Sequence, residues 1–155
     1  MCRMNRFLLA CSATLAGLVV ALPAAAQFQK PEDAVKYRES VMYVMANHVG
    51  RIGAMVQGRV PYDAAAARQN AEIVATLSQL PFVGFVEGTA GTGKGRASAK
   101  IWSERAKFDA AAKHMQEEVA KLVVAARTNS LDNVKAAFGN VGQACKGCHD
   151  NFRNP

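Results

Sequence analysis

The chain has 155 residues, of which 50% are hydrophobic, and its formal net charge is +7. A chain of this length is expected to form one domain with a sizeable core. The sequence has no cluster of Lys and Arg interleaved with aromatic residues, which argues against nucleic acid as a partner.

The first 26 residues have the pattern of a secretory signal peptide. Arg3 and Arg6 form a basic start, an apolar stretch follows over residues 7–22, and three alanines at 24–26 provide a cleavage site. We expect the mature domain, residues 27–155, to begin at Gln27, with its charge lowered to +5 by loss of the two arginines. The apolar stretch is too short for a membrane anchor. Export of this kind points to the periplasm.

The first helix is predicted from Pro31 to about Gly58. Proline suits the first turn of a helix, and Glu32 and Asp33 favour the positive end of the helix dipole. The residues of its predicted buried face recur in steps of three and four, and they are Val35, Arg38, Val41, Met42, Met45, Val49, Ile52 and Val56.

A second helix is predicted between Pro61 and Pro81. Residues 82–98 follow as a long loop that is rich in glycine but also contains Phe82 and Phe85. Long loops with aromatic residues are often functional, so we expect this one to pack over a site.

A third helix is predicted over about residues 100–127, with Trp102 and Phe108 in the core. A short turn leads to Ser130, whose hydroxyl group can cap a fourth helix over residues 131–152. No segment after the signal peptide shows the alternation of a strand. Helices with short connections predict an all-α protein, folded as an antiparallel four-helix bundle.

The most specific pattern lies near the end of the fourth helix and reads Cys145-Lys146-Gly147-Cys148-His149. Cys-x-x-Cys-His is the attachment sequence for c-type haem. Two thiols at this spacing can form thioethers to the two vinyl groups of one haem, and the adjacent imidazole can bind the iron. This pattern predicts a covalently bound haem.

Two other uses of a Cys-x-x-Cys pair fit less well. A thioredoxin-like dithiol normally follows a strand and opens a helix, where the dipole lowers a thiol pKa, whereas this motif closes a helical segment. A structural zinc site needs two further ligands. His48 and His114 are too isolated in the sequence to supply them, and both are expected at the surface.

Further segments carry a family resemblance. They are QFQKPEDAVKYR at 27–38, PYDA at 61–64, LPF at 80–82 with Phe85, GT at 88–89, IW at 101–102, AAFGNVG at 136–142 and CKGCHD at 145–150. With these segments the chain resembles the class II c-type cytochromes over essentially all of residues 27–155. It is most similar to cytochrome c′, a four-helix bundle.

The resemblance implies one haem c, attached through Cys145 and Cys148, with His149 as the proximal iron ligand. Arg153, one helical turn later, is implied to lie near the proximal face of the haem. Proteins of this family are typically homodimers that pack through their first two helices. Their haem is five-coordinate and high-spin, and it binds nitric oxide and carbon monoxide.

The resemblance also implies roles on the other side of the haem. Arg38 would neutralise a haem propionate, with Glu39 beside it. Met42 and Phe85 fall where the family places apolar residues over the vacant distal face.

Met42 leaves two mechanisms open. A thioether is a good axial ligand, and Met/His ligation makes a low-spin haem that transfers electrons at a raised potential. A related class II branch uses a methionine at this helix position, and the segments at 101–109 and 151–153 resemble that branch. Methionine on a helical stripe is more often an apolar core residue. The opening segment and the loop near Phe85 favour an unligated Met42.

Three classes of function follow from these alternatives. The favoured one is a protein that binds nitric oxide or carbon monoxide and can exchange electrons. The second is an electron carrier, which requires Met42 as a ligand. The third is a haem enzyme such as a peroxidase, and no distal His or Arg is placed to support it, so we expect no enzymatic activity. The sequence does not identify a redox partner.

Overall fold

The computed structural model describes residues 27–155, and the predicted signal peptide at 1–26 lies outside this part of the chain. The first helix, α1 (Pro31–Val56), begins with proline and has Glu32 and Asp33 in its first turn. It ends as predicted, because Gly58 takes a φ of +68°, which glycine adopts without strain.

The second helix is shorter than predicted. It is α2 (Ala64–Leu77), and the side chain of Asp63 caps it by accepting a hydrogen bond from the N–H of Ala66 at 3.0 Å. The cap places the start three residues after Pro61. Pro81 does not end this helix but begins a 3₁₀ turn, η2 (Pro81–Gly84), that leads into the predicted loop.

The prediction of one helix over residues 100–127 was wrong at one point. The chain forms a single turn, α3 (Lys100–Ser103), and then a long helix, α4 (Arg105–Arg127). Glu104 separates them because its backbone leaves the helical region, with φ −123° and ψ 41°. The last helix, α5 (Leu131–Phe152), has the predicted bounds, and Ser130 caps it by accepting from the N–H of Asn133 at 3.3 Å.

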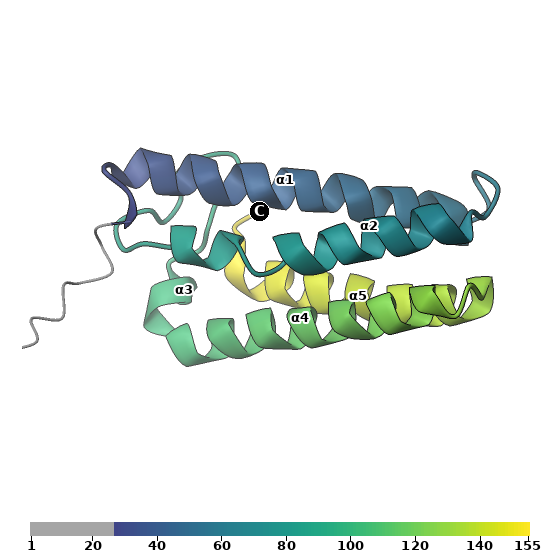
Figure 1. Ribbon diagram of the computed structural model, residues 1–155. Coiled ribbons are helices and arrows are strands. Elements are labelled where there is room, and N and C mark those ends of the chain that lie inside the picture. Colours follow the sequence, from purple (N-terminus) through teal and green to yellow (C-terminus); the bar gives the residue numbers. More distant parts are fainter. Residues whose placement is uncertain (1–26) are drawn as a thin grey trace, which may run out of the picture.

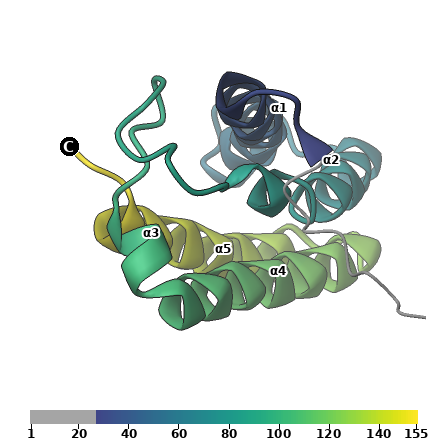
Figure 2. The same cartoon turned by 90° about the vertical axis from the view of Figure 1, so that its left-hand side faces the viewer.

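The four long helices form a four-helix bundle of two layers, with α1 and α2 packed over α5 and α4 (Figures 1 and 2). The main contacts join α1 to α2, α2 to α4 and α4 to α5, whereas α1 and α5 contact each other sparsely. Between residues 27 and 155 no strand forms, and the one β-bridge joins Ala97 to Arg153. The bundle predicted from the sequence is confirmed.

Two hydrophobic clusters fill the bundle. The main cluster runs along its length and includes Ile52, Val74, Leu122 and Val141, all completely or almost completely buried. The second cluster lies at the end that carries the C-terminus, and it is built from Ala97, Ile101, Phe108 and Phe152 with Phe82, Phe85, Trp102, Ala111 and Cys148 packed against it. The cysteine motif lies where these two clusters meet.

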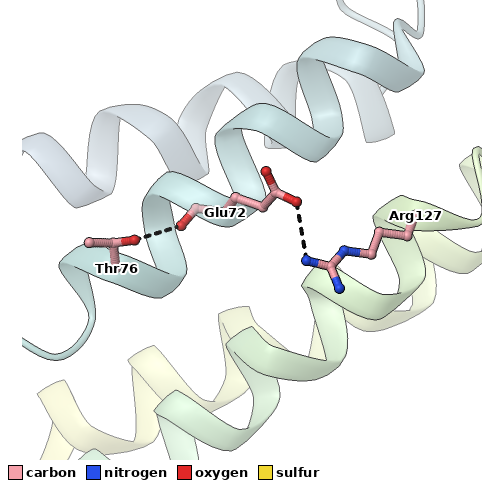
Figure 3. A network of polar contacts seen from close by, with 3 residues as sticks. All are labelled: Glu72, Thr76 and Arg127. Carbon is pink, nitrogen blue, oxygen red and sulfur yellow. Dashed lines mark hydrogen bonds and ion pairs between the residues drawn. The ribbon is translucent and has the colours of Figure 1, made fainter.

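Most ion pairs of residues 27–155 join neighbours on one helix, and such exposed pairs stabilise a fold little. The exception joins two helices. Arg127 Nη2 on α4 lies 3.3 Å from Glu72 Oε1 on α2, and the Glu72 carbonyl accepts from Thr76 (Figure 3). No helix in the described part of the chain is both long enough and apolar enough to span a membrane.

Candidate functional site

The two cysteines of the motif lie one turn apart on the inner side of α5. Both thiols are free and partly buried. Cys145 packs against the main cluster and Cys148 against the second cluster. Burial raises the pKa of both thiols, and for Cys148 the neighbouring Cys145 adds to the rise. Two thiols one turn apart on one helix face, embedded in apolar side chains, are suited to attach one edge of a flat apolar group.

His149 follows directly and lies on the exposed side of the last turn of α5. Desolvation lowers the pKa of its imidazole, the charge of Arg153 lowers it further, and Asp150 acts in the opposite direction. The net effect favours the neutral ring, which is the form that binds a metal ion. Arg153 is exposed, and its backbone N–H donates to the carbonyl of His149 at 3.1 Å.

Arg38 is a buried cation on α1, with 3% of its surface exposed. Its Nη1 donates to the carbonyl of Gly84 at 2.8 Å and to Thr89 Oγ1 at 2.6 Å, and its Nη2 donates to the carbonyl of Thr89 at 3.0 Å. Burial lowers the pKa of the guanidinium, and the charge of Glu39 partly offsets this. None of the carboxylates of residues 27–155 forms an ion pair with Arg38. A guanidinium has five N–H donors, so some remain for a further acceptor.

Glu39, the next residue, holds the far end of the same loop. Its Oε1 accepts a hydrogen bond from the N–H of Gly95 at 2.6 Å. Gly93 passes so close that a Cβ there would lie 2.2 Å from Glu39 Oε1, and its φ is +73°. The loop after η2 therefore needs glycine where it crosses α1.

Phe85 lies at the centre of an aromatic contact network. The guanidinium carbon of Arg38 lies 4.7 Å from the centroid of its ring. On α4, Phe108 packs edge-on against it with the ring centroids 4.9 Å apart. Phe82 stacks on it at 6.2 Å.

Met42 lies one turn after Arg38 on α1 and is partly buried. It packs against the main cluster, and so does Cys145. The structure thus brings Met42 and Cys145 to one cluster, and Phe85 and Cys148 to the other, while Arg38 contacts Phe85 directly.

The two other histidines take no part in this arrangement. His48 Nδ1 lies 2.7 Å from Asn70 Oδ1 in a bond between α1 and α2, so this ring is more enclosed than the sequence predicts. His114 is exposed and lines a groove of about 520 Å³ between α4 and α5, which Cys148 also lines. In the described residues no group of three His, Cys, Asp or Glu side chains could hold a metal ion.

Sequence reasoning did not identify Thr89, Gly84 or Phe108 as neighbours of the site. Thr89 is 1% exposed, and its hydroxyl group donates to the carbonyl of Val86 while accepting from Arg38. The dense glycines of the loop were the available signal, because close backbone approach requires them. Nothing in the sequence marks which residues, 46 to 58 positions away, these glycines approach.

The residues present fit a covalently bound haem. The half-buried thiols suit thioether formation, and the adjacent imidazole favours the neutral, iron-binding form. A buried guanidinium with spare donors and no carboxylate partner suits a propionate. The aromatic side chains around Phe85 supply an apolar surface for the macrocycle.

Comparisons with known proteins agree with a covalently bound haem. A family model described as Cytochrome C' matches residues 33–153. A cytochrome c' of Alcaligenes xylosoxydans xylosoxydans is 48% identical over 127 residues, which cover 82% of this chain and 98% of the relative. The crystal structure of cytochrome c' from Rubrivivax gelatinosus matches with a TM-score of 0.77 at 47% identity and covers 83% of this chain and 100% of that one. A nitric oxide complex of a mutant cytochrome c prime from Alcaligenes xylosoxidans matches with a TM-score of 0.77 at 46% identity. This match covers 83% of this chain and 99% of that one.

Proposed function

The chain belongs to the cytochrome c′ family, and on that premise we propose that it is a periplasmic haem protein that binds nitric oxide and carbon monoxide and can exchange electrons. Proteins of this family carry one covalently attached haem c. When bound, the haem supplies an iron with a coordination position for a diatomic gas and with two oxidation states. We propose that the protein is not an enzyme.

In this proposal Cys145 and Cys148 hold the haem and His149 binds the iron. Arg38 faces a propionate with its spare N–H donors, and Glu39 lies beside it. Arg153 adds positive charge close to His149, which its lowering of the imidazole pKa supports. These assignments rest on the packing of the cysteines, the burial of Arg38 and the motif itself.

The observation that carries the gas-binding proposal is the apolar character of Met42 and Phe85, the two side chains that the proposal assigns to the distal side. Neither side chain offers a hydrogen-bond donor. The guanidinium of Arg38 donates to Gly84 and Thr89 and stacks on Phe85, and the proposal assigns its spare donors to a propionate. Bound dioxygen needs a distal donor more than nitric oxide or carbon monoxide does, so an apolar distal side favours the latter two. The nitric oxide complex of a relative 46% identical to this chain supports the same conclusion.

A second candidate function is electron transfer with Met42 as the sixth ligand. Met42 and Cys145 pack against one cluster from opposite helices, which favours this alternative because the thioether lies on the side of α1 that faces the core. Met/His ligation would close the position to gases and raise the reduction potential. The two candidates therefore differ in the coordination of the iron.

Absorption spectra of the purified ferric and ferrous protein, with and without carbon monoxide, separate the two candidates. The gas-binding proposal expects broad high-spin bands and ready formation of a carbon monoxide complex. Sharp low-spin bands and little reaction with carbon monoxide would instead establish Met42 ligation. Met42→Ala should accelerate carbon monoxide binding to the ferrous protein, because the substitution removes bulk from the distal side. An unchanged association rate would contradict the steric role of Met42.

We also propose that the protein is a homodimer that packs through α1 and α2. On α1, Tyr43 is 72% exposed and Val44 is 43% exposed, although both lie in the middle of the helix. Exposed apolar side chains next to each other on one helix often mark an interaction surface.

A further inference from the structure

Phe108 is a buried ring at the centre of the second cluster. It lies on the first turn of α4 and is 2% exposed. Three other phenylalanine rings pack against it edge-on, with centroid distances of 4.9 Å to Phe85, 5.3 Å to Phe152 and 5.8 Å to Phe82. Edge-to-face contacts of this kind orient rings as well as burying them.

The position of Phe85 depends on these side-chain contacts. Phe85 follows the last residue of η2, and its backbone, with φ −91° and ψ 65°, belongs to no regular element. Its N–H donates to the carbonyl of Phe82 at 3.2 Å, but this main-chain bond does not orient the ring. The guanidinium carbon of Arg38 lies 4.7 Å from the centroid of the Phe85 ring, and the centroid of the Phe108 ring lies 4.9 Å from it. Arg38 also holds the two ends of the segment 84–89, so Phe108 is the main restraint that comes from the other layer of the bundle.

Phe108 also contacts the helix that carries the haem motif. Phe152 is the last residue of α5, four positions after Cys148 and three after His149. Phe108 therefore touches both the turn that contains the iron ligand and the aromatic side chain expected over the opposite face. No other ring among residues 27–155 has recorded aromatic contacts with both Phe85 and Phe152.

We propose that Phe108 is a positioning residue that fixes the ring of Phe85 relative to the last turn of α5 and thereby limits the room for a gas ligand. This inference rests on the proposed function. Without the ring of Phe108, Phe85 can move toward α4 and leave the distal side. The free-energy barrier to entry of the gas ligand is then lower. Phe108→Leu should therefore speed association of carbon monoxide with the ferrous protein by about tenfold, which corresponds to about 1.4 kcal/mol in the barrier.

The test uses the haem-loaded protein and flash photolysis of its carbon monoxide complex. Phe138→Leu is the matched control, because Phe138 is a partly buried phenylalanine that packs against the main cluster and approaches Gly53 on α1. Both variants should lower the midpoint of thermal unfolding, but only Phe108→Leu should raise the association rate. Equal rate changes in the two variants would overturn the positioning role, since a general loosening of the core would then explain both.

A double substitution shows whether Phe108 acts through Phe85. Phe108→Leu should change the rate by less than twofold in a protein that already carries Phe85→Leu, because the ring to be positioned is gone. Effects that multiply in the double variant would overturn the proposal. Phe108→Met, whose unbranched side chain fills irregular space more readily, replaces Phe108→Leu if that variant does not accumulate with haem. If the unsubstituted ferrous protein binds no carbon monoxide, the proposed function fails; if it binds carbon monoxide and Phe108→Leu leaves the rate unchanged, only the present inference fails.

Discussion

Arg38→Met removes the guanidinium that joins α1 to the segment after η2 while keeping an unbranched apolar side chain of similar reach. Three hydrogen bonds disappear, but their acceptors are not equally affected. The Thr89 carbonyl still accepts from Thr92, and the Thr89 hydroxyl group still donates to Val86. The carbonyl of Gly84 loses the partner that Arg38 supplied.

The expected loss of stability follows from these contacts. An unsatisfied buried carbonyl costs about 1–3 kcal/mol, and loss of the cation–π contact with Phe85 costs about 1–2 kcal/mol more. Relief from burying a charge without a carboxylate partner offsets part of this. We expect the free energy of unfolding of the haem-loaded protein to fall by about 2–4 kcal/mol.

The assay is urea unfolding followed by circular dichroism, with stability taken from the midpoint and slope. Arg51→Met is the matched control, because Arg51 is an exposed arginine on the same helix, for which no ion pair is recorded. It should cost less than about 0.5 kcal/mol. Equal costs for the two substitutions would refute the argument that the Arg38 guanidinium holds the loop. The reduction potential gives a second readout, since in the proposed site Arg38 lies beside a haem propionate, and loss of its positive charge should stabilise the ferric state and lower the potential.

Two further substitutions test the loop and the proposed dimer. Gly93→Ala should destabilise the protein by about 2 kcal/mol or more, because it adds backbone strain of about 1–2 kcal/mol to a collision with Glu39; Gly91→Ala, at φ +67° with no atom within 4 Å of its Cβ, adds the strain alone. Equal denaturation midpoints for these two variants would contradict the collision. Tyr43→Lys should shift the protein toward the monomer in sedimentation velocity, whereas Val124→Lys, at a residue 64% exposed on α4, should not. A dimer that persists in Tyr43→Lys would exclude this part of α1 from the interface.

The sequence predicts some elements to the residue and misses others for identifiable reasons. α5 has a capping serine at its start and an apolar stripe throughout, so local signals define it. The start of α2 has a local signal as well, because Asp63 caps it, whereas the prediction of this helix rested on Pro61. The break at Glu104 has no comparable signal, because neither proline nor glycine occurs there. Tertiary contacts of α3 decide it, since Ile101 and Trp102 pack in the second cluster.

In the candidate site, too, the sequence predicts some features and not others. Cys145, Cys148 and His149 are neighbours in the sequence, and their spacing alone indicates the chemistry. The partners of Arg38 lie 46 and 51 residues away and depend on how the loop crosses α1. Periodicity places Arg38 on a buried face but cannot say what it contacts there. The resemblance to a family supplied the propionate role, and the structure adds the loop contacts.

These loop contacts explain how the two sides of the site are held together although α1 and α5 touch each other sparsely. Arg38 and Glu39 bind the loop from α1, while the N–H of Ser98 donates to the carbonyl of Phe152 and the N–H of Asn154 donates to that of Arg96. The loop lies beside the start of α1 and the C-terminal end of α5 (Figure 2). Because main-chain groups make several of these bonds, the spacing between the two helices depends on the path of the loop more than on direct helix packing. Under the proposed function, changes in the length of this loop should therefore alter gas binding while leaving the core of the bundle intact.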